Sequence, residues 1–357
     1  MTEPILRRGW TTGACATAAA RAAFAALQGA EIPDPVEIAL PGGGRTAFAL
    51  ALGEAGDGYG RAGVVKDAGD DPDVTHGALV VATVRPGAAG AGVTFRAGEG
   101  VGTVTRPGLP IPPGEPAINP VPRAMIRAAL AEAAAALGVA ADAEVEIAIP
   151  GGARLAERTL NGRLGILGGL SILGTTGIVV PYSCAAWIDT IHRGIDVARA
   201  LGLDHVAGAT GATSEVAVQA LHGLAEPALI DMGDFVGGML KYLRRHPVPR
   251  VTVAGGVAKM TKLAQGLLDL HSRRGEVDRA FLAERAREAG AGEGLAAAIL
   301  DCNTAAQGFD LAASEGVPLG AVVAERARAT AAACLGRAAG LDVALFDRAG
   351  RLVARAG

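Results

Sequence analysis

Residues 37–46 read EIALPGGGRT, and residues 146–155 read EIAIPGGARL, so the chain carries an internal repeat. Each copy is a short aliphatic run that ends in Pro-Gly-Gly, which is typical of a strand that closes in a tight turn. Each copy also follows an Ala-rich segment that predicts a helix, over about 15–27 and about 121–137. We therefore expect two related helix–strand–turn–strand units whose strands share one sheet in an α+β domain.

The pattern changes after about residue 175. Short apolar runs that predict strands now alternate with helical patterns, the strands at 178–181, 205–209, 228–231 and 250–254 and the helices at 185–201, 214–224 and 235–245. Such alternation predicts a parallel sheet of the Rossmann kind. Later segments predict helices over 278–289, 294–313 and 319–339, followed by a hairpin of 343–346 with 351–354.

The expected fold class is therefore α/β in two parts. An α+β domain built from the duplicated unit occupies residues 1–175, and a Rossmann-like parallel α/β domain with a helical C-terminal part occupies residues 176–357. A chain of 357 residues is long enough to give each part its own hydrophobic core.

Composition limits the classes of partner. The 33 basic residues do not exceed the 36 acidic ones, so the excess positive charge of a nucleic-acid-binding surface is missing. The cysteines form no C-x-x-C pair, which fits a reducing compartment. No apolar run reaches the roughly 20 residues that a membrane span needs. We expect a cytoplasmic protein that binds neither nucleic acid nor membrane, with a homo-oligomer left open.

Two kinds of catalytic centre lack support in the sequence. The six histidines are scattered along the chain, and none stands four residues from another beside a Glu, so no metal site is expected. No serine lies in a G-x-S-x-G turn, the arrangement that exposes a nucleophilic hydroxyl.

Six longer stretches are more specific than composition. They are RGWTTGACATAAARAA (8–23), VVKDAGDDPDVTHGA (64–78), GEGVGTVTRPGLPIPPGEPAINPVPRAMI (98–126), ERTLNGRLGILGGLSILGTTGIVVPYS (157–183), MGDFVGGML (232–240) and AGGVAKMTKLAQGLLDLHS (254–272). Taken in this order, they resemble the cobalt-precorrin-5B C(1)-methyltransferase family, CbiD, from about residue 8 to about 350. Two departures fall in one loop: Ala258 stands where the family pattern has glycine, and Ala254-Gly255-Gly256 replaces a Gly-His turn.

The resemblance implies a methyltransferase of cobalamin biosynthesis. The reaction would use S-adenosyl-L-methionine to methylate C-1 of cobalt-precorrin-5B, a corrin precursor, and would give cobalt-precorrin-6A. Methyl transfer from a sulfonium can rely on positioning and on a dry pocket, so it fits a chain without a recognisable metal motif.

Donor-binding residues are expected where the predicted parallel strands end, because open α/β sheets bind ligands beyond those ends. Glycines there let the backbone approach a ligand, an acidic side chain can accept from ribose hydroxyls, and a lysine can meet a carboxylate. The candidates are Gly208, Thr210, Gly211, Asp231, Gly233, Asp234, Gly255, Gly256 and Lys259. The alternative is that they are ordinary turn residues, since Gly and Asp are common in turns.

Substrate-binding residues are expected in the first domain, because a carboxylate-rimmed tetrapyrrole suits guanidinium groups and helix starts. The candidates are Arg8, Thr11, Thr12, Gly13, Arg106, Asn119, Arg123, Arg158, Asn161 and Arg163. Such a site requires the arginines to face a common hollow. As an alternative, Thr11, Thr12 and Asn119 are simply helix caps, each contributing about 1 kcal/mol.

An acidic cluster between two predicted strands, 63–66 and 78–84, supplies the candidates for a catalytic base. Asp67, Asp70 and Asp71 are the candidates, with Asp73 as a fourth member, because one of these carboxyls could act as a base if its neighbours raise its pKa. The alternative is a loop, in which Asp-Asp-Pro-Asp is equally at home.

Two other functions remain open from the residues themselves. The glycine-bearing strand ends could hold a dinucleotide, as in an NAD(P)-dependent reductase of the same pathway, although no G-x-G-x-x-G follows a strand. A non-catalytic tetrapyrrole carrier would use the same arginines and helix starts without a methyl donor.

Overall fold

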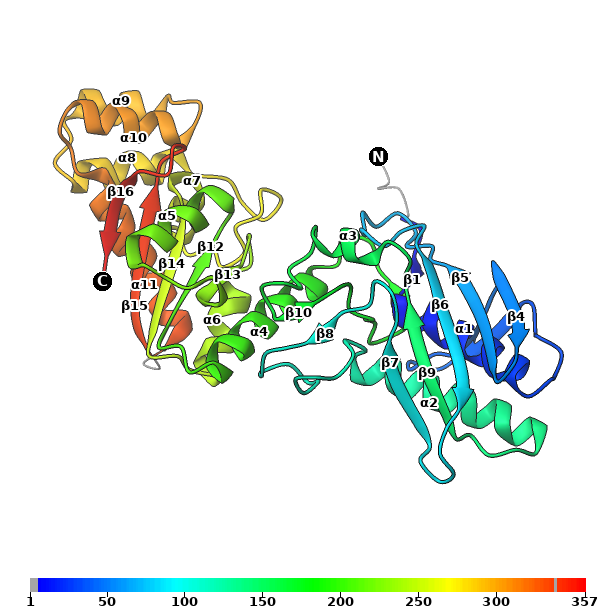
Figure 1. Cartoon of the computed structure of the whole chain (residues 1–357). Helices are drawn as coiled ribbons and strands as arrows, with labels where there is room; N and C mark the ends of the chain where they lie inside the picture. Colours follow the sequence, from blue (N-terminus) through cyan, green and yellow to red (C-terminus); the bar gives the residue numbers. More distant parts are fainter. Residues whose placement is uncertain (1–5, 337–338) are drawn as a thin grey trace. The chain divides into compact units, whose positions relative to one another are not determined.

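The computed structural model describes residues 6–336 and 339–357 (Figure 1). Over these residues the chain forms two compact units, and the boundary between them falls between Ser183 and Cys184. The sequence placed this boundary near residue 175 and assigned 178–181 to the parallel sheet. That strand assignment is wrong, because β11 (Ile178–Val179) pairs antiparallel with β1 (Gly9–Trp10), at the other end of the first unit.

The first unit is built on a mixed sheet with the strand order β4-β5-β6-β9-β7. Its strands are β4 (Leu52–Gly56), β5 (Tyr59–Val65), β6 (Leu79–Pro86), β7 (Val93–Ala97) and β9 (Ala143–Ala148). Helix α1 (Thr12–Leu27) packs on β5 and β6, and helix α2 (Pro120–Leu137) packs on α1. A Cβ at Gly60 of β5 would meet the backbone of Ala23, so alanines on α1 and a glycine on β5 permit this close approach.

The repeated unit gives two different structures. In the first copy, β2 (Val36–Ala39) pairs with β3 (Arg45–Phe48). In the second copy, β9 joins β6 and β7, and the turn is followed by the short helix α3 (Gly152–Ala156). The expectation that both copies share one sheet is therefore wrong. Residues 153–156 are Ala, Arg and Leu, which are strong helix formers, whereas RTAF favours a strand.

Two long loops of the first unit lie against each other. β8 (Thr103–Val104) pairs with β10 (Ile166–Leu167), and isolated bridges join Val101 to Leu170 and Ile118 to Ile172. This pairing brings residues 101–118 beside residues 161–172.

The second unit contains a mainly parallel sheet with the strand order β13-β12-β14-β15-β16. The strands are β12 (His205–Ala209), β13 (Leu229–Asp231), β14 (Arg250–Gly256), β15 (Gly340–Phe346) and β16 (Leu352–Ala356). All neighbours are parallel except β16, which closes a hairpin with β15. This confirms the expected parallel sheet and hairpin. The strand order is that of flavodoxin-like doubly wound folds.

Helices cover both faces of this sheet. Successive strand residues point to opposite faces, so neighbouring residues of one strand contact different helices. Val343 and Leu345 of β15 pack with α11 (Leu319–Leu335), whereas Ala344 packs in a separate cluster with Val218 of α5 (Ala212–His222) (Figure 1). The remaining helices of the unit are α4 (Cys184–Ala200), the 3₁₀ turn η1 (Glu226–Ala228), α6 (Val236–Arg245), α7 (Val257–Ala264), α8 (Arg279–Glu288), α9 (Glu293–Leu300) and α10 (Ala305–Ser314).

Some helix predictions need correction. The segment 294–313 is two helices rather than one, since Thr304 accepts a hydrogen bond from the Gln307 amide and starts α10 afresh. Helix α7 was not predicted at all. The helix predicted over 319–339 ends at Leu335, and residues 337–338 of that prediction lie outside the described residues. Within the described ranges, no helix has the length and apolar character needed to cross a membrane.

Candidate functional site

The sheet of the second unit has a topological switch point between β12 and β14, where connections leave toward opposite sides. The loop after β12 enters α5 at Ala212, and β14 leads directly into α7 at Val257. The amino ends of both helices therefore lie at the carboxyl edge of the sheet, and their unpaired amide groups favour an anion there.

Lys259 on α7 connects the ends of three strands. Its ammonium donates to the Thr210 carbonyl after β12 at 2.8 Å, and it lies 3.1 Å from Asp234 Oδ1 after β13. Among the described atoms, this ammonium is the partner of the buried Asp234 Oδ1, through an ionic contact rather than an aligned hydrogen bond. The structure thus brings together the predicted donor residues Thr210, Asp234 and Lys259.

The predicted glycines at this edge divide into two kinds. A Cβ at Gly208 would collide with Met239, and a Cβ at Gly255 would lie 2.7 Å from Thr210 Oγ1, so these glycines permit close packing. A Cβ at Gly211 or Gly256 would meet no described atom within 4 Å. Space beside the switch point is therefore open at Gly211 and Gly256.

Sequence reasoning missed Trp187 on α4. Its indole N–H donates to the carbonyl of Asp231, the last residue of β13, at 3.2 Å, yet the side chain is 47% exposed. The ring also covers Gly233, where a Cβ would lie 3.2 Å from Trp187 Cζ2. The available signal was a tryptophan in a chain whose residues are only 3% aromatic.

In the first unit, the start of α1 is bound to a neighbouring loop. Thr11 accepts from the Ala14 amide at 3.2 Å, as a cap does, and Thr12 Oγ1 accepts from the Leu173 amide at 2.9 Å. The Gly13 amide donates to the Leu173 carbonyl at 2.8 Å. These contacts give Thr11, Thr12 and Gly13 a role in holding α1 against that loop.

Helix α2 begins without the cap that the sequence predicts. The Asn119 side chain makes no capping hydrogen bond within the described helix. Pro122 occupies the third helical position and has no N–H to donate, which removes one of the two usual capping donors. Arg123 is also engaged, since its guanidinium donates to the Ile118 carbonyl at 2.8 Å and to Glu115 at 3.1 Å.

The paired loops carry three further candidates. Arg106 Nη1 donates to the Arg163 carbonyl at 3.0 Å, and Asn161 Nδ2 donates to the Gly169 carbonyl at 3.0 Å. Arg8 and Arg158 are exposed. Arg106 and Arg163 are therefore neighbours, whereas Asn161 stabilises the loop itself.

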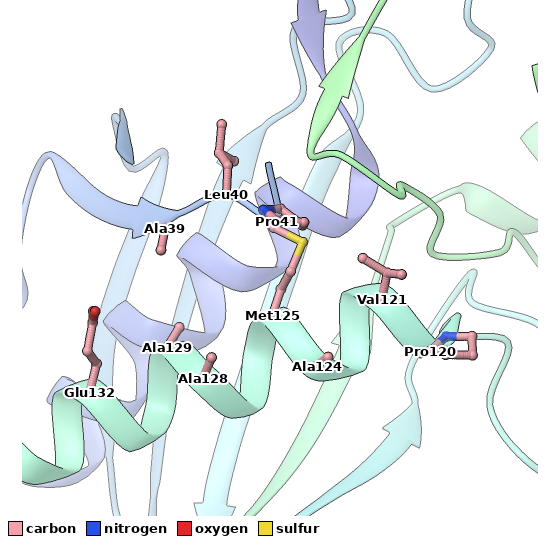
Figure 2. Close-up of a pocket in the computed structure, with 10 residues that line it drawn as sticks. All are labelled: Ala39, Leu40, Pro41, Pro120, Val121, Ala124, Met125, Ala128, Ala129 and Glu132. Atoms are coloured by element: carbon pink, nitrogen blue, oxygen red, sulfur yellow. The ribbon is translucent and has the colours of Figure 1, made fainter. Parts of the chain in front are cut away.

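An apolar groove of about 390 Å³ lies between the end of β2 and helix α2 (Figure 2). Leu40 and Pro41 line it on one side and Met125 on the other, with Glu132 at one end (Figure 2). Glu132 is paired with Arg21 and Arg45. None of the predicted substrate arginines is among the described residues that line this groove, so it is not the common hollow that the sequence required.

The acidic cluster is ion-paired and hydrogen-bonded. Asp67 pairs with the Arg7 guanidinium and accepts from the Gly69 amide, and the hydrogen bond from Arg7 is the main reason that its pKa falls to about 2. Asp67 is therefore not a member of the cluster with a raised pKa. Asp70 accepts from the Arg7 amide at 2.6 Å, and Asp71 accepts from the Tyr182 amide at 2.8 Å.

Asp73 faces a lysine inside the first unit. Lys66 is 1% exposed, and its ammonium donates to Asp73 at 2.6 Å, while Thr75 donates from both its amide and its hydroxyl. Burial alone raises the pKa of Asp73, but the charge and hydrogen bond of Lys66 and the bonds from Thr75 outweigh it. The pKa of this carboxyl therefore lies below its usual value.

Comparison with known proteins shows the family to which the chain belongs. The model of the CbiD family matches residues 2–181, and a second model, described as the CbiD C-terminal domain, matches residues 269–357. The chain belongs to the CbiD family. It is 67% identical over 351 residues to the cobalt-precorrin-5B C(1)-methyltransferase of Bradyrhizobium sp. strain BTAi1, covering 98% of this chain and 93% of that protein.

A second relative agrees with this CbiD assignment. The cobalt-precorrin-5B C(1)-methyltransferase of Agrobacterium fabrum is 65% identical over 98% of this chain and 93% of its own length. A crystal structure of the cobalamin biosynthesis protein (cbiD) from Archaeoglobus fulgidus has 27% identity and a TM-score of 0.41, and covers 75% of this chain and 83% of that chain.

This CbiD chain also gathers polar groups that are scattered in its sequence. His205, His222 and Asp342 place ligand-type atoms within 4.8 Å of one another, inside the second unit. Thr252 Oγ1 lies 2.8 Å from His205 Nε2 and donates to Asp342 at 2.6 Å, and Arg355 donates to the same carboxylate at 2.8 Å. A hydroxyl fills the space between the ligand-type atoms and a guanidinium already balances the carboxylate, so the geometry fits a hydrogen-bonded network better than a cation site.

Proposed function

We propose that this CbiD chain transfers the methyl group of S-adenosylmethionine to C-1 of cobalt-precorrin-5B and forms cobalt-precorrin-6A, in the cytoplasm. Support comes first from relatives of that name, which are 65–67% identical over 98% of the chain. It also comes from the carboxyl edge of a flavodoxin-like sheet, where a mononucleotide-like ligand is expected.

The donor would lie across the ends of β12, β13 and β14. Lys259 carries this part of the proposal, because it lies on the helix that follows β14 and its ammonium contacts the loops after β12 and β13. The Lys259 side chain is 37% exposed, so a carboxylate of the donor can reach the ammonium from solvent and compete with Asp234 for it. Asp231 ends β13 at the position where an acidic residue can accept from ribose hydroxyls.

The glycines at this edge would play three different roles around the donor. Gly211 and Gly256 face open space and leave room for the ligand beside the helix starts. Gly208 and Gly255 act one step back, by letting methionine and threonine side chains pack beneath the site. Gly233 holds the loop after β13 in a left-handed conformation with φ of 53°.

The chemistry asks for positioning. The bond from the methyl carbon to sulfur breaks as its bond to C-1 forms, so the sulfonium leaves as the neutral thioether of S-adenosylhomocysteine. An in-line approach held in a water-poor site can supply most of the acceleration. The residues at the sheet edge would bind and orient the donor and need not exchange a proton with it.

The corrinoid carboxylates would bind to the first unit. Arg8 and Arg158 are exposed, and the Arg106 guanidinium donates to the Arg163 backbone carbonyl between the paired loops. Arg123 is the weakest candidate, because Glu115 and backbone carbonyls already occupy its donors. Thr11, Thr12, Gly13, Asn119 and Asn161 would shape the loops around this region.

The test is a single incubation of the purified protein with cobalt-precorrin-5B and S-adenosylmethionine. Mass spectrometry of the corrinoid should show the gain of one methyl group, matched by an equal amount of S-adenosylhomocysteine. A corrinoid that binds tightly but gains no mass would support the carrier function instead. A change in mass that requires NAD(P)H, and not S-adenosylmethionine, would support the reductase.

A further inference from the structure

The structure holds an aromatic ring at the edge of the proposed donor site. Trp187 is anchored along the edge of its indole that carries Nε1, because Nε1 donates to the Asp231 carbonyl and Gly233 lies under the same edge. The ring is nevertheless 47% exposed. Its exposed part is a flat apolar surface that a ligand can contact, beside an edge that is held by a hydrogen bond.

The anchoring contacts connect Trp187 to the donor residues without a gap. Asp231 and Gly233 lead to Asp234 within one loop, and Asp234 contacts Lys259, which reaches Thr210 across the switch point. One end of this series of contacts is a flat aromatic ring, and the other end is a cation beside helix starts. S-adenosylmethionine has the complementary polarity, with a flat base at one end and a carboxylate at the other.

Neighbouring rings leave the indole free to accept such a base. The closest described aromatic ring is that of Phe235, with centroids 6.4 Å apart and planes tilted by 53°. That arrangement supports the ring from one side and is not a parallel stack. Adenine stacks well on indole, since every base offers a π face.

We propose that Trp187 binds the adenine ring of the methyl donor by stacking, and so positions the donor along the ends of β13, β12 and β14. The inference rests on the proposed function, because it assigns one residue of that donor site. Trp187 is a binding residue here and contacts no reacting atom. Its loss should therefore raise the KM for the donor more than it lowers kcat.

The experiment uses intrinsic fluorescence, since Trp10 and Trp187 are the tryptophans of the chain. In the full-length W10F protein, Trp187 emission should fall saturably on addition of S-adenosylmethionine or S-adenosylhomocysteine. Methionine alone, which lacks the base, should leave it unchanged. The dissociation constant from fluorescence should equal that from calorimetry on the unmodified protein.

Substitution then separates stacking from a structural role. Trp187→Ala should weaken donor binding by about tenfold to a hundredfold, whereas Trp187→Phe, which keeps a ring, should restore most of it. Leu300→Ala is the matched control, because Leu300 is a similarly exposed apolar residue of the same unit, at 46%. Thermal unfolding of each variant shows whether a loss of binding follows from a loss of fold.

The outcomes distinguish this inference from the proposed function. Normal donor affinity and methyl transfer in Trp187→Ala, with unquenched Trp187 emission, would overturn the stacking and leave the methyltransferase intact. Loss of affinity that Trp187→Phe fails to restore would also count against it. A wild-type protein that neither binds the donor nor methylates the corrinoid would overturn both.

Discussion

Each unit of this protein contains a Lys–Asp pair, and the two pairs are built for different purposes. In the first unit, Lys66 is 1% exposed and donates to Asp73 at 2.6 Å, with Thr75 completing the carboxylate's bonds. In the second unit, Lys259 and Asp234 are 37% and 22% exposed and lie 3.1 Å apart. A closed, fully satisfied pair holds a fold together, whereas a looser and more open one can exchange its partner for a ligand.

Removing the carboxylate from the closed pair should have the largest effect. Asp73→Asn leaves the buried Lys66 ammonium without a counter-charge, and we expect a loss of roughly 3 kcal/mol in the unfolding free energy of the first unit. Urea unfolding of the Trp187→Phe protein, in which Trp10 reports on the first unit, measures this loss. The added change Lys66→Met should recover part of it, because no charge is then left unpaired.

Asp70→Asn is the control for this comparison, because Asp70 is an exposed member of the same loop. It should shift the urea midpoint much less than Asp73→Asn. Equal shifts for the two variants would contradict the view that the pair of Lys66 and Asp73 is structural.

Breaking the open pair should affect binding more than stability. Lys259→Met removes the cation proposed for the donor carboxylate, and the affinity for S-adenosylmethionine should fall by about tenfold to a hundredfold, as for other charge-assisted contacts. The unfolding free energy should fall by about 1 kcal/mol, because the pair is partly exposed but the buried Asp234 Oδ1 loses its counter-charge. Lys241→Met, at an exposed position on α6, is the matched control for calorimetry. A large loss of stability with unchanged affinity would reverse the assignment.

Acid offers a smaller effect that is confined to the second unit. Burial lowers the pKa of both His205 and His222 below the ordinary value of 6.5. Below pH 6.5 the unfolded chain therefore binds more protons than the folded chain. The contribution of these histidines to the unfolding free energy is fully present above pH 6.5, and it declines as the pH falls toward the lowered pKa values. Urea unfolding of W10F at several pH values, followed by Trp187, should show this decline.

The matched variant for the acid experiment is His205→Asn with His222→Gln. It should show a flatter dependence on pH in the same range, although it is less stable at neutral pH. An unchanged slope would mean that other groups carry the acid sensitivity.

The smallest effect is expected in the acidic loop. Asp70→Asn and Asp71→Asn change carboxylates that accept hydrogen bonds from the backbone amides of Arg7 and Tyr182, respectively. Methyl transfer should fall by far less than the roughly hundredfold that loss of a general base costs. A hundredfold loss of kcat with an unchanged unfolding midpoint would instead restore the catalytic interpretation of these residues.

The parallel sheet could be predicted from sequence because its strands are continuous apolar runs. The strand at 205–209 was predicted with its observed bounds, and 250–254 lies within β14. The strand at 178–181 failed, since an apolar run does not say which sheet it joins, and its partner Gly9–Trp10 is far away in sequence. Asn119 failed because the prediction ignored the missing amide of Pro122.

The candidate site was predictable only in part. The predicted strand ends indicated Thr210, Asp234 and Lys259 as candidates for one site, because parallel strands place their carboxyl ends at one edge of a sheet. The structure brings these three residues into contact. The lowered pKa of Asp67 could not be foreseen from the acidic cluster, since its counter-charge on Arg7 comes from another part of the chain. Trp187 was missed because it enters from the helix before β12, and no local pattern links it to the end of β13.

The antiparallel pairing of β1 with β11 joins the N-terminal and C-terminal segments of the first unit, with Gly9 opposite Val179 and Trp10 opposite Ile178. The entrance and exit of this unit are thus neighbours, as in domains that tolerate circular permutation. A gene split at codon 184 should therefore yield a first half that folds by itself, and a short linker from Ser183 back to Arg7 should let new termini be opened in an exposed turn such as that at Gly43.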